Sequence, residues 1–231
     1  MLARVFRPTF LDVFDLTNLE LGTLFSTYGS VAFLSYVFGG VLADKFSPRK
    51  LLAYSLMLTS LGGFFMMSYP SYFTLQLIYA YWGFTTVFLF WAPMIKATSI
   101  IGGLKKQGKT FSFLDAGRGI VASSIGIIGV LIFAFVVVGD ISNSTLQEKR
   151  DAFRYVIGAS SLIVFITGII VYNFLNIEIN SEAKIGDFRD MKKLMKSKSV
   201  ILIGLIILTA YMGYKITDIY SLYASEIMLF D

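Results

Sequence analysis

Cysteine and histidine are both missing from this chain of 231 residues. Their absence excludes disulfide bonds, metal sites built from thiolate or imidazole ligands, and proton relays that use imidazole. Charged residues are also scarce, because they make up 15% of the chain whereas a soluble domain has about 25%. We find no nucleophile–base constellation, no metal-ligand spacing and no phosphate-binding loop, and we therefore predict neither an enzyme nor a cofactor.

Apolar residues make up 56% of the chain, and its mean hydropathy is +0.72. They occur in runs of roughly 20 residues, the length at which a helix crosses the hydrocarbon core. A membrane β-barrel would show shorter segments of alternating polarity, and residues 201–210 do not alternate. We therefore predict an all-α fold, a polytopic membrane helical bundle. Its spans are expected at residues 21–43, 51–69, 72–95, 110–139, 154–175 and 199–223.

Lysine and arginine gather in alternate loops of this predicted path. Cations follow the first, third and fifth spans, whereas residues 68–72 between the second and third spans carry no charge. Because short loops rich in Lys and Arg stay in the cytoplasm, we predict that these loops are cytoplasmic and that residues 1–20 lie outside. The cations behind the net charge of +5 therefore set the orientation in the membrane. For this reason we expect no nucleic-acid partner. The cations after the first and third spans are Lys45, Arg49, Lys50, Lys105, Lys106 and Lys109.

The first basic loop carries the most specific motif of the chain, since residues 39–50 read GGVLADKFSPRK. They resemble the loop signature of the major facilitator superfamily, approximately G-x-L-A-D-R/K-x-G-R-R/K. Ser47 replaces the second Gly and Pro48 the first Arg, and a Ser-Pro pair is a competent turn initiator. The positions that match in order are Gly40, Leu42, Ala43, Asp44 and Lys45.

Three stretches narrow the resemblance within the superfamily: DKFSPRK, FWAPMIKAT and LDAGRG. They are similar to the organophosphate–phosphate antiporter branch and its sugar-acid relatives. The resemblance implies a secondary transporter of the bacterial inner membrane that moves a small anionic organic solute by alternating access. It also implies either antiport with phosphate or symport with protons, which Asp or Glu would carry because histidine is absent.

The resemblance further implies two halves of six helices each. On that pattern, residues 1–175 are the N-terminal bundle, residues 176–198 the cytoplasmic central loop, and residues 199–231 the first helix of the C-terminal bundle. The six spans then correspond to helices two to seven, and residues 4–15 to the tail of an incomplete first helix. We expect the chain to be truncated at both ends, with the remainder of the transporter as its missing partner.

The motif supplies four candidate gating residues: Gly40, Asp44, Lys45 and Arg49. In the family, the carboxylate at Asp44 caps or contacts a neighbouring helix end and stabilises the state in which the cytoplasmic side is closed. An anion gains roughly 0.3–1 kcal/mol at a helix N-terminus. The alternative is a solvated loop acid. Lys45 and Arg49 either pair with acids across the gate or only set the topology.

Asp115 and Arg118 are ionisable residues inside the predicted fourth span. Their i, i+3 spacing lets them pair, and ionisable groups in a membrane usually face a cavity or a partner. We interpret Asp115 as a gating residue and Arg118 as a gate or substrate-binding residue, with a structural ion pair as the alternative. Lys96, at the end of the third span, is interpreted as a side chain that extends to the membrane interface.

Lys215 and Asp218 repeat that spacing in the last span, and we take them as substrate-binding and gating candidates. An internally neutralised pair is the alternative. In the organophosphate branch, an arginine in this helix helps to bind the phosphate. A lysine lacks the bidentate fork of arginine, so this helix indicates an anionic solute in general and not phosphate in particular. Arg4 is a third substrate-binding candidate, corresponding to the anion-binding arginine of helix one. A solute sensor without net transport, or a non-functional fragment, would fit the same residues.

Overall fold

The computed structural model describes residues 2–137, 144–177 and 196–215, with residues 220, 223, 224, 227 and 228. These residues form helices, and no strand occurs among them. The chain divides into two compact units. The larger is Thr9–Asn180, and the other combines Met1–Pro8 with Ser181–Asp231. Most of the candidate residues lie in the larger unit, and we describe each unit by itself.

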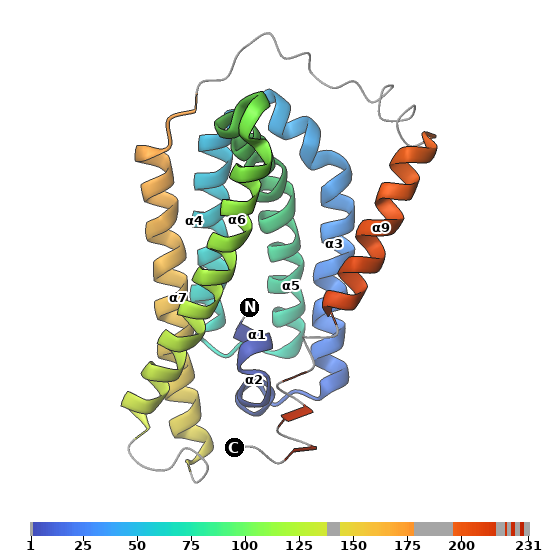
Figure 1. Cartoon of the computed structure of the whole chain (residues 1–231). Helices are drawn as coiled ribbons and strands as arrows, with labels where there is room; N and C mark the ends of the chain where they lie inside the picture. The colour runs from blue at the N-terminus through green and yellow to red at the C-terminus, as the bar shows by residue number, and fades with distance from the viewer. Residues whose placement is uncertain are drawn as a thin grey trace. The chain divides into compact units, whose positions relative to one another are not determined.

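A helix occurs at each of the six predicted spans (Figure 1), which confirms the all-α membrane bundle. Residues 138 and 139 of the fourth predicted span and most of residues 216–223 of the sixth lie outside the described residues. The larger unit contains α3 (Asn18–Lys45), α4 (Pro48–Met66), α5 (Tyr72–Gly83), the π-helix η1 (Phe84–Trp91), α6 (Ala92–Val136), α7 (Leu146–Phe174) and most of α2 (Arg7–Phe14). The other unit contains α1 (Leu2–Val5) and α9 (Lys198–Lys215).

Three helical stretches of the described residues are long and apolar enough to cross a membrane: Tyr72–Gly103, Lys105–Val136 and Leu146–Phe174. Helix α3 is a fourth when its two parts, which are bent by 53°, are taken as one span. Helix α4 has 19 residues and is therefore about 28 Å long, close to the hydrocarbon thickness of about 30 Å.

Local hydrogen bonds explain where α3 and α7 begin. Thr17 and Glu20 form a capping box at the start of α3, and Thr145 and Glu148 form the same box at the start of α7. In each box, the threonine hydroxyl accepts from the glutamate N–H while the carboxylate accepts from the threonine N–H at 2.8 Å. The box starts α7 eight residues before the predicted span, at Leu146 instead of residue 154.

Helix α6 reverses direction between the third and fourth predicted spans. Gly103 has φ 53° and ψ −168°, and Lys106 has φ −125° and ψ 16°. The positive φ at Gly103 is a conformation that costs glycine little because it has no Cβ. Figure 1 shows this reversal at the same end of the bundle as the turn between α3 and α4. We call this end the lysine end, because Lys45, Lys105 and Lys106 lie in these two turns.

Helices α4 and α7 form the most extensive helix pair of the larger unit. Small residues meet along it, since Gly63 faces Ser161 and Gly168 faces the backbone of Ala53. In lipid, small residues stabilise a helix pair by letting the two backbones approach closely. The pair therefore forms a closely packed side of the bundle.

At the opposite end of the bundle, α2 is attached to the start of α7. The Arg150 Nε donates to the carbonyl of Val13 at 3.0 Å, and Lys149 pairs with Asp12 at 3.1 Å. The Tyr69 hydroxyl, in the turn after α4, donates to the carbonyl of Arg150. Burial raises the pKa of Tyr69 to about 12, so this hydroxyl keeps its proton and remains a donor at physiological pH.

Candidate functional site in helices α3, η1 and α6

Arg118 and Asp115 form an ion pair on α6, with 3.1 Å between Nη1 and Oδ1. The guanidinium carbon also lies 5.0 Å from the centre of the Trp91 ring, at the end of η1. Arg118 lies about 20 Å along the arm Lys105–Val136 from its lysine end, well inside an apolar span. The two side chains are 52% and 73% exposed, so the pair lies on the surface of the bundle and is available to a ligand or another helix.

Asp44 pairs with Lys96, which lies one turn beyond the start of α6. The distance between Lys96 Nζ and the Asp44 carboxylate is 3.7 Å, and Nζ also donates to the carbonyl of Ala43 at 2.7 Å. Ala43 is in the last turn of α3, where carbonyl groups lack helical partners and the helix dipole favours a cation. Lys96 is only 20% exposed. Lys96 therefore joins α6 to the end of α3. That it extends to the membrane interface stays a prediction.

The other motif residues have different surroundings. Arg49 donates from Nη1 to the Oδ1 of Asn176 at 3.3 Å and lies 5.8 Å from the Tyr172 ring, so it joins α4 to the end of α7. Lys45 is exposed and takes part in no ion pair within residues 2–137, 144–177 and 196–215. Gly40 is exposed, and a Cβ built there has no heavy atom within 4 Å apart from its own helix and chain neighbours.

A network of hydroxyl groups joins η1 to α4. Ser55 Oγ donates to the carbonyl of Thr85 at 2.8 Å, and Thr59 Oγ1 donates to Thr85 Oγ1 at 3.0 Å. Trp82 Nε1 in turn donates to the carbonyl of Thr59 at 2.9 Å. Ser55 and Thr85 are almost completely buried. Because an unpaired buried polar group is costly, this network stabilises η1 in its observed position.

The same π-helix is held on its other side by α3. Thr86 Oγ1 donates to the carbonyl of Trp82 at 2.6 Å, which leaves its lone pairs to accept from the Tyr28 hydroxyl at 3.0 Å. A Cβ at Gly83 would lie 2.6 Å from the carbonyl oxygen of Tyr28, so only glycine permits this approach of α3 to α5. Long π-helices are rare, and π-turns are frequent at functional sites.

Proline contributes to the irregular backbone at the end of η1. Pro93, near the start of α6, has no N–H, so one carbonyl in the preceding turn lacks its helical donor. The carbonyl oxygen of Phe88 lies 3.3 Å from a Cβ built on Gly39 of α3, which places this part of η1 directly against the motif-bearing helix. Trp91, the partner of Arg118, is the last residue of this irregular turn, and Lys96, the partner of Asp44, lies about one turn beyond it.

The remaining predicted site residues either belong to the smaller unit or lie outside the described residues. Arg4 is half-buried in α1, in the smaller unit. Lys215 ends α9, but its side chain lies outside the described residues, as does Asp218. Within the described parts of the chain, no cluster of three His, Cys, Asp or Glu side chains could hold a metal ion.

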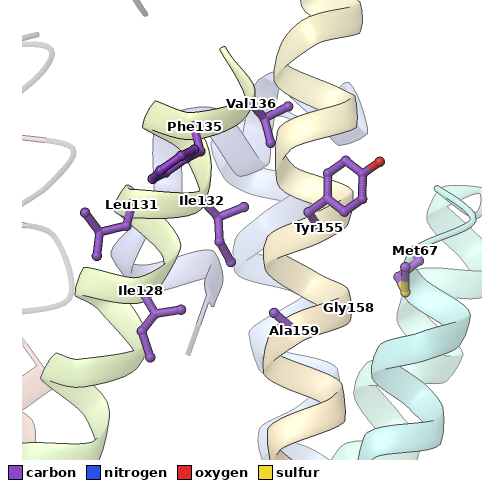
Figure 2. A pocket seen from close by; sticks show the side chains of 9 residues that line it. All are labelled: Met67, Ile128, Leu131, Ile132, Phe135, Val136, Tyr155, Gly158 and Ala159. Atoms are coloured by element: carbon purple, nitrogen blue, oxygen red, sulfur yellow. The ribbon is translucent and has the colours of Figure 1, made fainter. Parts of the chain in front are cut away.

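A shallow groove between α6 and α7 has a different character (Figure 2). Apolar side chains of α6 line it together with Tyr155, Gly158 and Ala159 of α7 and Met67 at the end of α4. No charged residue lines this groove, so it offers nothing to bind an anion. The α6 residues that line it are Ile128, Leu131, Ile132, Phe135 and Val136.

Two functional candidates, Lys96 as a gating residue and Trp91 as a partner of Arg118, were missed from the sequence. The signal for Lys96 is its position as a lone cation directly after Pro93 in an otherwise apolar stretch. Trp91 has no such signal, because its role depends on the side-by-side placement of η1 and α6, which residue spacing does not reveal.

The comparisons with known proteins agree with this picture. The model of the Major Facilitator Superfamily matches residues 1–229. The chain is 26% identical over 208 residues to the inner membrane protein YqcE of Escherichia coli K12, covering 90% of this chain and 46% of that protein. It is 27% identical over 210 residues to the inner membrane protein YihN of the same organism, covering 88% and 48%. The chain thus spans about half the length of these curated relatives. No solved structure matches it.

Proposed function

Because the chain belongs to the Major Facilitator Superfamily, we propose that it moves a small organic anion across the bacterial inner membrane by alternating access. The superfamily, predicted from residues 39–50, is confirmed. Membership in it supports a membrane transporter rather than an enzyme, and we propose that activity for the native protein. The organophosphate branch, the solute and the coupling ion stay predictions. The activity belongs to the native protein, whose relatives are about twice as long as this chain.

The observation that carries the anionic solute is the environment of Arg118. A guanidinium inside an apolar span is expensive unless it faces a partner or a water-filled cavity. Arg118 is oriented by Asp115 and by the Trp91 ring, yet half of its side chain remains exposed. Its planar fork is suited to a carboxylate or a phosphate. We assign Arg118 to solute binding and Asp115 to holding it in place while the site is empty.

The pair of Lys96 and Asp44 supplies the gating part of the proposal. It links α6 to the end of α3 at the lysine end of the bundle. Alternating access requires such contacts to form on the closed side and to break when that side opens. We assign the pair to the state that is closed at the lysine end. Protons, when coupled, would be carried by a carboxylate such as Asp115, because the chain has no histidine.

Uptake of organic anions by membrane vesicles that contain the native protein tests the role of Arg118. We expect Arg118→Gln to reduce uptake of the transported sugar phosphate or sugar acid at least tenfold, corresponding to about 1.4 kcal/mol. Arg118→Lys should retain part of the uptake, because it keeps the charge but not the fork.

A matched control exists in α7, where Arg154 and Asp151 form a pair with the same i, i+3 spacing. Arg154→Gln should leave uptake within a factor of two. Equal loss in both variants, or equal uptake of neutral sugars, would refute the anion site at Arg118. Specific binding without any uptake would instead favour a solute sensor. The intact mass of the native protein, measured in the same vesicles, shows the length of the chain to which the activity belongs.

A further inference from the structure

The reversal of α6 carries a positive charge that no acid among the described residues neutralises. Lys105, Lys106 and Lys109 are all exposed, and none takes part in an ion pair within the described part of the chain. The sequence has no Asp or Glu between Asp44 and Asp115, and both of these acids pair with other cations. We call residues 101–113 the lysine turn.

The lysine turn has a defined shape. The side chain of Gln107 donates to the hydroxyl of Ser99 at 3.2 Å across the turn, and Thr110 Oγ1 donates to the carbonyl of Lys106 at 2.9 Å. A Cβ at Gly102 would lie 2.7 Å from Thr110 Oγ1, so the two arms of the turn touch. The backbone therefore holds the three lysines together at the tip.

Large apolar side chains flank the lysines on both arms. Ile101 is 63% exposed and Phe113 is 68% exposed. The Nζ of Lys109 lies 5.9 Å from the centre of the Phe113 ring. A cationic tip beside exposed apolar side chains is the arrangement found where protein segments enter a membrane interface, with apolar groups among the acyl chains and cations at the headgroups.

We propose that the lysine turn is a binding site for anionic phospholipids of the leaflet at the lysine end. The ammonium groups bind the headgroup phosphates, and Ile101 and Phe113 contact the upper acyl chains. Lysine clusters next to membrane spans attract anionic lipids in proportion to their charge. The apolar flanks favour a lipid over a free anion, because a soluble anion gains nothing from them. The bound lipid would tether the arm that carries Lys96.

Native mass spectrometry of the native protein, released from membranes in mild detergent, tests this site. Phosphatidylglycerol and phosphatidylcholine are supplied in equal amounts, and the lipids retained per protein are counted. We expect preferential retention of phosphatidylglycerol by at least fivefold. The triple variant Lys105→Gln, Lys106→Gln, Lys109→Gln should lose this preference, whereas the matched triple exchange to Arg should keep it.

Two further arms separate a lipid site from a site for soluble anions. The double variant Ile101→Ser, Phe113→Ser keeps every charge and should lower phosphatidylglycerol retention at least twofold. Inorganic phosphate at millimolar concentration should leave retention unchanged. Unaltered preference in the triple Gln variant, or displacement of the lipid by phosphate, would overturn the proposal. If the triple variant does not fold, the unmodified protein still provides a test. Equal retention of phosphatidylglycerol and phosphatidylcholine by it would also overturn the proposal.

Discussion

At the residue scale, Lys96 shows how one cation satisfies two kinds of acceptor. Its ammonium group donates to a carbonyl of the last turn of α3 and pairs with the Asp44 carboxylate. Four carbonyl groups at the end of any helix lack intrahelical donors, so Lys96 supplies a bond that α3 does not make by itself. The contact thus stabilises the fold and, in the proposed mechanism, one state of the transport cycle.

We expect Lys96→Met to lower the free energy of unfolding by about 1 kcal/mol, because the Ala43 carbonyl and the Asp44 carboxylate lose a partner in a half-buried site. The unfolding midpoint in detergent measures this. Lys45→Met is the matched control, since Lys45 is exposed and unpaired among the described residues, and it should leave the midpoint unchanged. If both variants lose the same free energy of unfolding, Lys96 contributes only its positive charge and not its specific contacts.

The contacts of a single residue could be predicted from the sequence where the partner is close in the chain. The pair of Asp115 and Arg118 follows from its i, i+3 spacing on one helix and is confirmed. The partners Lys96 of Asp44 and Asn176 of Arg49 are 52 and 127 positions away in the chain. Such partners depend on which helices pack side by side, and neither periodicity nor charge pattern contains that information.

At the scale of the helical element, η1 combines an irregular backbone with hydrogen bonds to the helices on both sides of it. Ser55 and Thr59 of α4 bond to Thr85 on one side of η1, and Tyr28 of α3 bonds to Thr86 on the other. A buried polar network stabilises one arrangement when every member is paired. The π-helix is therefore fixed by its neighbours, and removal of one of these hydroxyl groups should weaken it.

Removal of the Ser55 hydroxyl tests this dependence. We expect Ser55→Ala to lower the free energy of unfolding by about 1–3 kcal/mol, because the buried carbonyl of Thr85 loses its donor. Ser68→Ala removes a hydroxyl that donates to the carbonyl of Phe65 at the same distance, 2.8 Å, but at an exposed site. That control should change stability by less than about 0.5 kcal/mol. The measurement is the unfolding midpoint of each variant. Equal midpoints would contradict the claim that the hydroxyl network stabilises η1.

The sequence locates the helices better than it locates their irregularities. Runs of apolar residues place a described helix at each predicted span, yet α7 begins at Leu146 because a capping box extends it into the preceding loop. The π-helix was not predicted, since the residues of η1, FTTVFLFW, have the composition of any apolar helix. Its backbone depends on Pro93 and on hydroxyl groups from other helices, which act only after the helices have packed.

At the scale of the whole molecule, the larger unit follows an alternating path in which cations outnumber acids at one end. The turn between α3 and α4 and the reversal of α6 share the lysine end (Figure 1). The turn after α4 and the start of α7 lie together at the opposite end, joined by Tyr69 and Arg150. The positive-inside rule predicts that the lysine end faces the cytoplasm.

The absence of cysteine allows a direct test of this orientation. A single cysteine is introduced either at Phe46, which is exposed at the lysine end, or at Ser71, which is exposed at the opposite end. With a maleimide that does not cross membranes, intact cells should label Ser71→Cys and not Phe46→Cys. Both should react after the cells are permeabilised. Labelling of Phe46→Cys in intact cells would reverse the predicted orientation.

Family and architecture were within reach of the sequence, because apolar run length and one loop motif are sufficient for both. The domain boundaries at residues 175 and 198 remain predictions, as do the roles of Arg4, Lys215 and Asp218. These depend on how the smaller unit meets its neighbours, whereas the match over residues 1–229 establishes only the family.

The two capping boxes have a consequence for biosynthesis. With the lysine end in the cytoplasm, the starts of α3 and α7 are the parts that must be carried across the bilayer during insertion. Each arrives with a threonine and a glutamate that bond to its first turn, so backbone N–H groups are already paired as they leave water. In each helix the four consecutive residues of the box thus pair two backbone N–H groups without help from any other helix.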